Sequence, residues 1–208
     1  RSDLDQLDHG GNLLQDVTSM KSAEDTDGVI TSCRNYGAVE ADLNAGGIAG
    51  SMNVDYEDDQ EKDPDMSSLN IATRINASSV VAYSVNYGGG IVGLQELGLV
   101  YGCESYGNIS SDSGSYLGGI AGDSLAAIQN SYVRSQVEGS DYLGGIAGSG
   151  ATMTGNVAMV NLQSDGEGVG SVAGVVADDG GSVESNYFVG EEYGAIDDIS
   201  YSGAAEPV

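Results

Sequence analysis

Acidic side chains are the most abundant chemically active groups in this sequence. The stretch "DYEDDQEKDPD", residues 55–65, holds seven acids and one lysine. Oxygen ligands suit Ca²⁺, so a calcium site here would draw on Asp55, Glu57, Asp58, Asp59, Asp63 and Asp65. The stretch lacks the Asp-x-Asp-x-Asp-Gly spacing of an EF-hand and the Gly-Gly-x-Gly-x-Asp nonapeptides of calcium-binding β-rolls. A solvated acidic loop is therefore the simpler interpretation.

Five tyrosines stand at fixed distances from repeated sequence words. Tyr36, Tyr87 and Tyr106 each follow a small side chain by three residues, and Tyr116 and Tyr142 each precede a glycine-rich word by two. On an exposed face these rings would bind a glycan or a protein partner, because tyrosine offers a large area and a hydroxyl at low entropic cost. The alternative is an aromatic stack that seals a corner of the fold. The complete absence of tryptophan favours that alternative.

The sequence offers little for acid–base or nucleophilic catalysis. Its single histidine, His9, stands in an irregular N-terminal stretch, and its bases after Arg1 are scattered: Lys21, Arg34, Lys62, Arg74 and Arg134. With 32 acids in the chain, carboxylate pairs occur by chance, so none marks a glycosidase site. We therefore expect no enzyme and, apart from the calcium alternative, no cofactor. A carbohydrate-active enzyme is the minor alternative. The internal repeat described below predicts a parallel β-helix, and many proteins with that fold cleave polysaccharides.

The overall charge limits the classes of partner. The 208 residues carry 32 acids against 6 lysines and arginines, a formal net charge of −26. A surface of this sign repels phosphate backbones and anionic lipid head groups, so we expect no nucleic-acid binding. No stretch approaches the roughly 20 apolar residues that cross a bilayer, so we expect no membrane insertion in this segment. Because the chain starts at Arg1, we expect a piece of a longer precursor with flanking domains.

The elements that would position these side chains are set by an internal repeat. A glycine word, "GGIAG" in three of its five copies, starts at Gly46, Gly89, Gly118, Gly144 and Gly170, at steps of 43, 29, 26 and 26 residues. A second column places an apolar residue three positions before a small or polar one. Its apolar members are Ile30, Val81, Val100, Ile128, Met153 and Val183, and their partners are Cys33, Ser84, Cys103, Ser131, Asn156 and Asn186.

This repeat predicts an all-β solenoid. A unit of about 26 residues is too short to bury its own apolar side, so successive units must stack. Its apolar residues alternate over strand-sized pieces, and its glycines interrupt any helix. The sequence therefore predicts a right-handed parallel β-helix of about six turns, with three short strands in each. An aliphatic ladder should point inward, formed by Ile48, Ile91, Ile120, Ile146 and Val172.

The two cysteines test this register. Cys33 and Cys103 occupy the same column two turns apart, with Ser84 between them. That places their Cα atoms about 10 Å apart, beyond the roughly 7 Å limit of a disulfide. We therefore predict no disulfide and two buried thiols.

Three regions interrupt or flank the repeats. Residues 1–27 form an N-terminal arm or cap in which Leu4, Leu7 and Leu14 also fit the end of an upstream coiled coil. Residues 28–190 hold the β-helix repeats, with an acidic insertion at 51–79. Residues 191–208 form a C-terminal cap and exit segment.

The segment "IQNSYVRSQVEGSDYLGGIAG", residues 128–148, resembles the GLUG-type repeats of bacterial surface proteins. The resemblance covers about residues 28–190 and extends to secreted or surface proteins of gut Firmicutes. The chain departs from the family pattern at 84–90, which lacks about eight residues, and at 51–79. The resemblance implies a β-helical fold and an extracellular or bacterial cell-surface location, and it brings no catalytic motif.

These observations favour a non-enzymatic interaction or adhesion module, whose partner would be a glycan or a host or matrix protein. The alternative is a structural spacer that holds another domain of a larger surface protein away from the cell.

Overall fold

The computed structural model describes residues 29–30, 34–36, 38–41, 43–52, 70–72, 75–76, 80–82, 87–177, 181–189, 193–197 and 205–208. Within these ranges the chain is all-β, without a helix, and every strand pairing is parallel. The strands stack as a β-solenoid of about four turns, with about 26 residues in each turn. The predicted fold class is thus confirmed at this level. None of the described residues forms a helix that is long and apolar enough to span a membrane.

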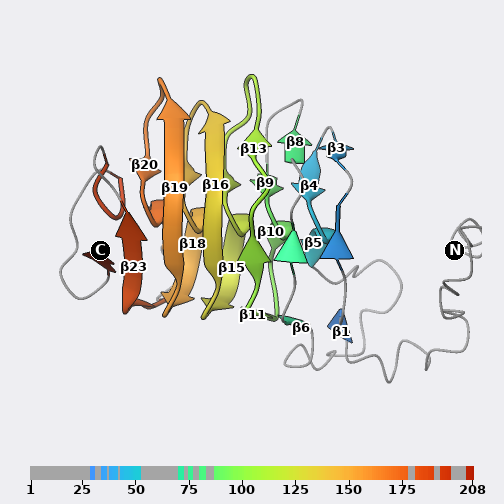
Figure 1. Cartoon of the computed structure of the whole chain (residues 1–208), viewed down its shortest axis with the longest axis horizontal. Helices are drawn as coiled ribbons and strands as arrows, with labels where there is room; N and C mark the ends of the chain where they lie inside the picture. Colours follow the sequence, from blue (N-terminus) through green and yellow to red (C-terminus); the bar gives the residue numbers. More distant parts are fainter. Residues whose placement is uncertain are drawn as a thin grey trace, which may run out of the picture.

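The solenoid has three sheets, which we call A, B and C. Sheet A contains β1 (Val29–Ile30), β5 (Ala49–Met52), β6 (Asn70–Ala72), β10 (Val92–Gln95), β11 (Leu99–Tyr101), β15 (Ala121–Gln129), β18 (Ala147–Thr154), β21 (Ala173–Val176) and β22 (Val183–Glu184). Sheet B contains β2 (Arg34–Asn35), β3 (Val39–Ala41), β7 (Ile75–Asn76), β8 (Val80–Ala82), β12 (Glu104–Ser105), β13 (Ile109–Ser110), β16 (Tyr132–Gly139), β19 (Val157–Ser164), β23 (Asn186–Val189) and β24 (Ala205–Pro207). Sheet C contains β4 (Asn44–Gly46), β9 (Tyr87–Gly89), β14 (Leu117–Gly118), β17 (Leu143–Gly144) and β20 (Val169–Gly170). Figure 1 shows the strands of sheet B side by side, with those of sheet A behind them.

The core contains a ladder of aliphatic residues that stack from rung to rung. Ile91, Ile120, Ile146 and Val172 are fully buried, and Ile48 packs against them half-buried. Each backbone N–H of this ladder bonds to the carbonyl of the next member, as between Ile91 and Ile120 at 2.9 Å. The predicted aliphatic ladder is therefore confirmed, and it fixes the sequence register of the whole coil.

The glycine word is required by close backbone contact. A Cβ on Gly144 would overlap the carbonyl oxygen of Ala147 and lie 2.8 Å from the Cα of Ala173 on the next rung. The first glycine of every other copy meets the carbonyl three residues ahead in the same way. None of these first glycines has a positive φ. Gly is needed here because the turn is tight, and the left-handed conformation plays no part.

A buried polar column runs beside the aliphatic ladder. The backbone N–H of Ser131 donates to Asn156 Oδ1 at 2.9 Å, and that of Asn156 donates to Asn186 Oδ1 at 3.0 Å. The Cys103 N–H donates to Ser131 Oγ at 3.2 Å on the preceding rung. The small-or-polar column of the repeat thus satisfies the backbone where the chain passes from sheet A to sheet B.

One member of the apolar column was assigned wrongly. Val100 pairs with Ile71 of β6, which also pairs with Ile30, whereas Val81 belongs to β8 in sheet B and pairs with Glu40 and Ser110. The remaining members follow the predicted order from Ile128 through Met153 to Val183. Strands β6 and β7 therefore lie within the range 51–79 that was predicted as an insertion.

Cys103 is a member of the polar column, and its thiol is buried. Its Sγ lies 3.6 Å from the carbonyl oxygen of Tyr101. Cys33 and Ser84, with which the sequence placed it in register, lie outside the described residues.

Candidate functional site

Three of the five predicted tyrosines form one stack, which we call the tyrosine ladder. Tyr87, Tyr116 and Tyr142 stand in register, each directly before the strand of sheet C or at its start. The rings of Tyr116 and Tyr142 are stacked, with centroids 4.7 Å apart and an interplanar angle of 12°. Those of Tyr87 and Tyr116 are tilted by 48° at 5.5 Å. Tyr87 thus belongs with the glycine words, and its assignment to the same column as Tyr36 and Tyr106 was wrong.

The tyrosine ladder ends against a glycine. Gly168 occupies the next rung after Tyr142, with φ +69°, and a Cβ there would lie 2.7 Å from Tyr142 Cδ1. Tyr116 and Tyr142 themselves have φ values of 59° and 57°, which bulky side chains rarely adopt. All three ladder rings are half-buried. Much of the ring area of the ladder is therefore covered by contacts between its own members. This favours the interpretation that the tyrosines seal a corner of the fold.

Burial also affects the pKa of two residues of the ladder, Tyr87 and Tyr116. It is the main cause that raises the pKa of Tyr87 above its usual 10.0, and the carboxylates of Asp123 and Glu96 raise it further. Burial likewise raises the pKa of Tyr116, with Tyr142, Tyr87 and Asp123 adding to the effect. These hydroxyls stay neutral over the physiological range, so they can donate hydrogen bonds but cannot act as bases.

Tyr106 and Tyr36 lie elsewhere, on the outer face of sheet B. Tyr106 is 43% exposed, and its hydroxyl donates to Glu104 Oε2 at 2.7 Å. That hydrogen bond is the main cause that raises the pKa of Tyr106, while Arg134 opposes the shift. Tyr36 is 72% exposed and follows Asn35, which stands two rungs from Ser105 in the register of sheet B.

Two parallel rows of side chains continue from Tyr106 along the outer face of sheet B. The Glu104 row runs from rung to rung through Glu104, Tyr132, Val157, Tyr187 and Glu206. The Tyr106 row is two residues further along the strands and holds Tyr106, Arg134, Met159, Val189 and Val208. The residues between the two rows point inward and are buried, for example Val133, Ala158 and Phe188.

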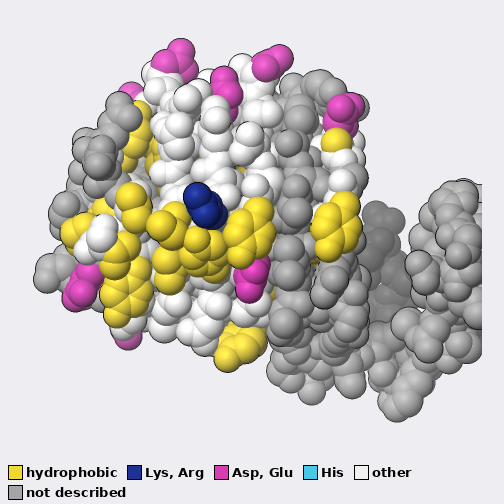
Figure 2. All heavy atoms as spheres, viewed as in Figure 1, with side chains coloured by type: hydrophobic (Ala, Val, Ile, Leu, Met, Phe, Trp, Pro, Cys, Tyr) yellow, Lys and Arg dark blue, Asp and Glu magenta, His cyan; other side chains and the backbone are white. Residues whose placement is uncertain are grey.

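The apolar members of these rows form a continuous surface, which we call the apolar band. It comprises Tyr106, Tyr132, Val157, Met159, Tyr187, Val189 and Val208. Met159 and Tyr187 are each 40% exposed, and the Tyr132 hydroxyl lies 3.0 Å from Met159 Sδ. The rings of Tyr106 and Tyr132 contact at 5.9 Å. Figure 2 shows the band crossing β16, β19 and β23, with one basic side chain within it.

Most of the apolar band was missed by the sequence analysis. Tyr132 and Tyr187 each directly follow a member of the polar column, Ser131 and Asn186. This spacing puts them on the outer face of sheet B, since the next residue along the strand points inward. The signal was present in the repeat but becomes visible only when the strand that follows the column is aligned in full.

No protein-family model matches the chain, and no curated protein or solved structure matches it either. What the chain does must therefore be argued from its own surface.

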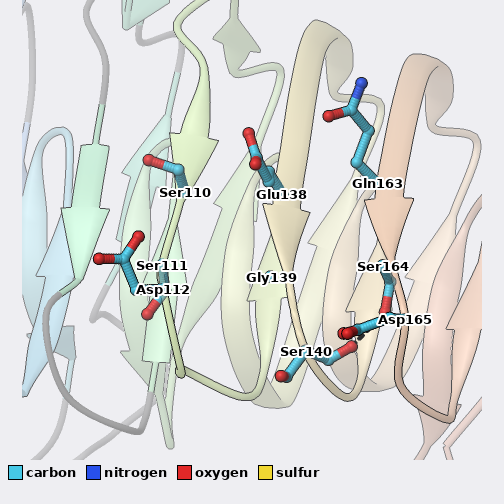
Figure 3. Close-up of a pocket in the computed structure, with 9 residues that line it drawn as sticks. All are labelled: Ser110, Ser111, Asp112, Glu138, Gly139, Ser140, Gln163, Ser164 and Asp165. Atoms are coloured by element: carbon cyan, nitrogen blue, oxygen red, sulfur yellow. Dashed lines mark hydrogen bonds between the residues drawn. The ribbon is translucent and has the colours of Figure 1, made fainter.

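A second feature is an open polar hollow of about 440 Å³ at the far ends of β13, β16 and β19. Its lining residues, drawn in Figure 3, are Ser110, Ser111, Asp112, Glu138, Gly139, Ser140, Gln163, Ser164 and Asp165. Several of its hydroxyls already serve the turns: Ser111 Oγ accepts from the Gly114 N–H at 2.8 Å, and Ser164 Oγ bonds to the Ser140 carbonyl. The hollow is therefore a weaker candidate than the band.

Metal ligation has no candidate among the residues that the structure describes. No group of three or more His, Cys, Asp or Glu side chains is placed there to hold an ion. The calcium ligands suggested by the sequence, from Asp55 to Asp65, lie outside the described ranges, so that hypothesis stays a prediction.

Proposed function

We propose that this chain is a non-enzymatic interaction or adhesion module, and that the apolar band is the face that binds its partner. The observation that carries the proposal is a continuous surface of three tyrosines, a methionine and three valines on the outer face of sheet B, of which Tyr106, Met159, Tyr187 and Val208 are exposed. Soluble proteins seldom leave such an area uncovered, and contiguous apolar patches commonly mark interaction sites. Tyrosine and methionine are also enriched where proteins bind one another.

The location and family are part of the same proposal. The resemblance of residues 128–148 to GLUG-type repeats supports a secreted or cell-surface protein of a bacterium. The candidate partners are a glycan, a host or matrix protein, or a flanking domain of the same precursor. The finer architecture that we propose is a right-handed coil of six turns, supported by the column that runs from Ile30 to Val183.

The test is a binding screen against immobilised glycans and extracellular-matrix proteins, with calcium and then with chelator. A band variant, Tyr106→Ser/Met159→Ser/Tyr187→Ser, is compared with the control Tyr101→Ser/Leu125→Ser. The control residues are each 44% exposed and lie on sheet A. We expect saturable binding that the band variant weakens at least about tenfold and the control leaves unchanged. Equal loss in both variants, with both folded by circular dichroism, would contradict the band.

A structural spacer is the second candidate function. It is supported by the uniform stacking of parallel rungs, which gives a stiff rod with a repeating cross-section. A spacer predicts no ligand in the screen and an unchanged adhesion phenotype when the band variant replaces the native chain in the precursor.

A further inference from the structure

Two acidic residues flank the apolar members of the Glu104 row. Glu104 precedes and Glu206 follows Tyr132, Val157 and Tyr187, which occupy the three rungs between the two acids. Beyond Glu104 the same register continues to Ile75 of β7 and Arg34 of β2. Adjacent parallel strands lie about 4.8 Å apart, so the two carboxylates are separated by roughly 19 Å. An extended polypeptide covers this distance in about six residues.

The charge of the chain discriminates between occupants of the band. A second copy would bring another net charge of −26 against the first, which opposes self-association. A basic partner is attracted by the same field and is steered toward the molecule. The tilted rings of Tyr106 and Tyr132, at 49° to one another, form no flat platform for a sugar ring.

The basic residue within the band sets a further condition. Arg134 lies between Tyr106 and Met159 in the Tyr106 row and is exposed. A basic side chain placed over Arg134 would be repelled by it, whereas an apolar one would pack on the neighbouring Tyr132 and Met159. The two carboxylates therefore favour basic groups, and the residues between them favour apolar groups.

Resting on the proposed function, we infer that the apolar band binds an extended polypeptide segment with lysine or arginine at both ends and apolar residues between them. The basic side chains pair with Glu104 and Glu206, and the apolar residues cover Tyr132, Val157 and Tyr187. The spacing between the basic residues is the specific part of the inference, since it follows from the number of rungs.

The experiment uses three synthetic peptides as probes and measures their affinity by fluorescence anisotropy on the full chain. The first has lysines at positions 1 and 7, valines at 3 and 5 and threonines at 2, 4 and 6, so that lysines and valines share one face of the extended chain. The second has the lysines at positions 1 and 5, on the same face but closer together, and the third replaces both lysines of the first with glutamate. We expect the first to bind about three- to tenfold more tightly than the second at low salt, and the third to show no binding.

Variants locate the interaction on the band. Glu104→Gln/Glu206→Gln should abolish the preference for the first peptide over the second, and Tyr132→Ser/Tyr187→Ser should weaken both about tenfold or more. Arg134→Gln should leave binding of the first peptide equal or tighter. Tyr101→Ser/Leu125→Ser serves as the control on sheet A and should change nothing.

Three results would overturn the inference: equal affinity for both lysine spacings, binding of the glutamate peptide, or a dimer in sedimentation velocity that the band variants dissociate. If a glycan or matrix protein binds the band in the screen while the peptides show no discrimination, the inference fails and the proposed function stands. If neither screen nor peptides detect binding, both fail.

Discussion

The phenol ring of Tyr142 lies flat on that of Tyr116, 4.7 Å away, although both residues are held at a positive φ. Such a backbone conformation costs on the order of 1–3 kcal/mol for a bulky residue. It persists because the surrounding coil fixes it and the rings gain from stacking. At the corner before sheet C, the backbone strain of Tyr116 and Tyr142 is therefore offset by the stacking of their rings.

A double-mutant cycle on Tyr116→Ala and Tyr142→Ala measures that opposition. We expect a coupling free energy of about 0.5–1.5 kcal/mol, because each ring is the other's main stacking partner. Chemical denaturation of the four proteins gives the value. Additive effects would show that the two rings contribute only through burial.

The buried polar column predicts a large cost for Asn156→Ala. Asn156 accepts from the Ser131 N–H and donates to the Ile128 carbonyl, and both groups would be left buried without this partner. Each unsatisfied group costs about 1–3 kcal/mol, so we expect a loss of about 2–5 kcal/mol in the free energy of unfolding. Asn161→Ala, exposed on the strand β19 that follows Asn156, is the control and should stay within about 0.5 kcal/mol. A similar change in both would mean that the column is dispensable.

The glycine word predicts that Gly144→Ala is severely destabilising. The added methyl group would overlap backbone atoms of Ala147, which have no room to move within a stacked rung. We expect the free energy of unfolding to fall by more than about 4 kcal/mol, or the variant not to fold. Thermal unfolding of the variant and of the native chain measures the difference. Gly139→Ala is the control, because its Cβ would meet chiefly the end of the Leu117 side chain. Tolerance of Gly144→Ala would mean that the turn relaxes more than the packing implies.

An unpaired buried hydroxyl predicts a stabilising substitution. Ser105 Oγ is fully buried and has no hydrogen-bond partner among the described residues. Ser105→Ala removes this cost, and we expect a gain of about 1 kcal/mol in the free energy of unfolding. Ser124→Ala should do the opposite, since Ser124 Oγ donates to Gln95 Oε1 at 2.8 Å. A destabilised Ser105→Ala would point to an ordered water at this position.

The raised tyrosine pKa values predict a loss of stability in alkali. Tyr87, Tyr106 and Tyr116 bind their protons more tightly in the folded state than in the unfolded state. Their contribution is complete below the ordinary pKa of 10.0 and is lost as the pH rises through the higher folded values. Denaturant midpoints measured between neutral pH and strong alkali should fall above about pH 10. Tyr87→Phe/Tyr116→Phe should make this fall shallower, and an unchanged slope would refute the assignment.

The sequence predicted those parts of the fold that depend on identical rungs. The ladder from Ile91 to Val172 and the polar column from Cys103 to Asn186 were readable because each residue meets its own copy. Val81 was misplaced because a short apolar strand followed by a serine fits two positions in the coil equally well. Its partners in β3 and β13 are decided by the pairing of the whole turn, which a local pattern does not contain.

The candidate site was less predictable than the fold. Tyr106 was named from its spacing, but the apolar band depends on side chains from separate turns, such as Met159 and Tyr187, that meet across the face of sheet B. No single repeat unit carries the band. It arises only from the addition of units that differ slightly at the same outward position.

The parallel register has one last consequence, for how such a chain can change in length. Leu117 and Leu143 are equivalent positions on adjacent rungs, as are Gly118 and Gly144. Removing residues 118–143 would join Leu117 to Gly144, and every ladder would close again one rung shorter. The length of the solenoid can therefore change in steps of one turn, about 4.8 Å, when a repeat unit is duplicated or lost. The cross-section of the solenoid stays the same. A lineage that uses this scaffold can tune how far it extends without redesigning how it folds.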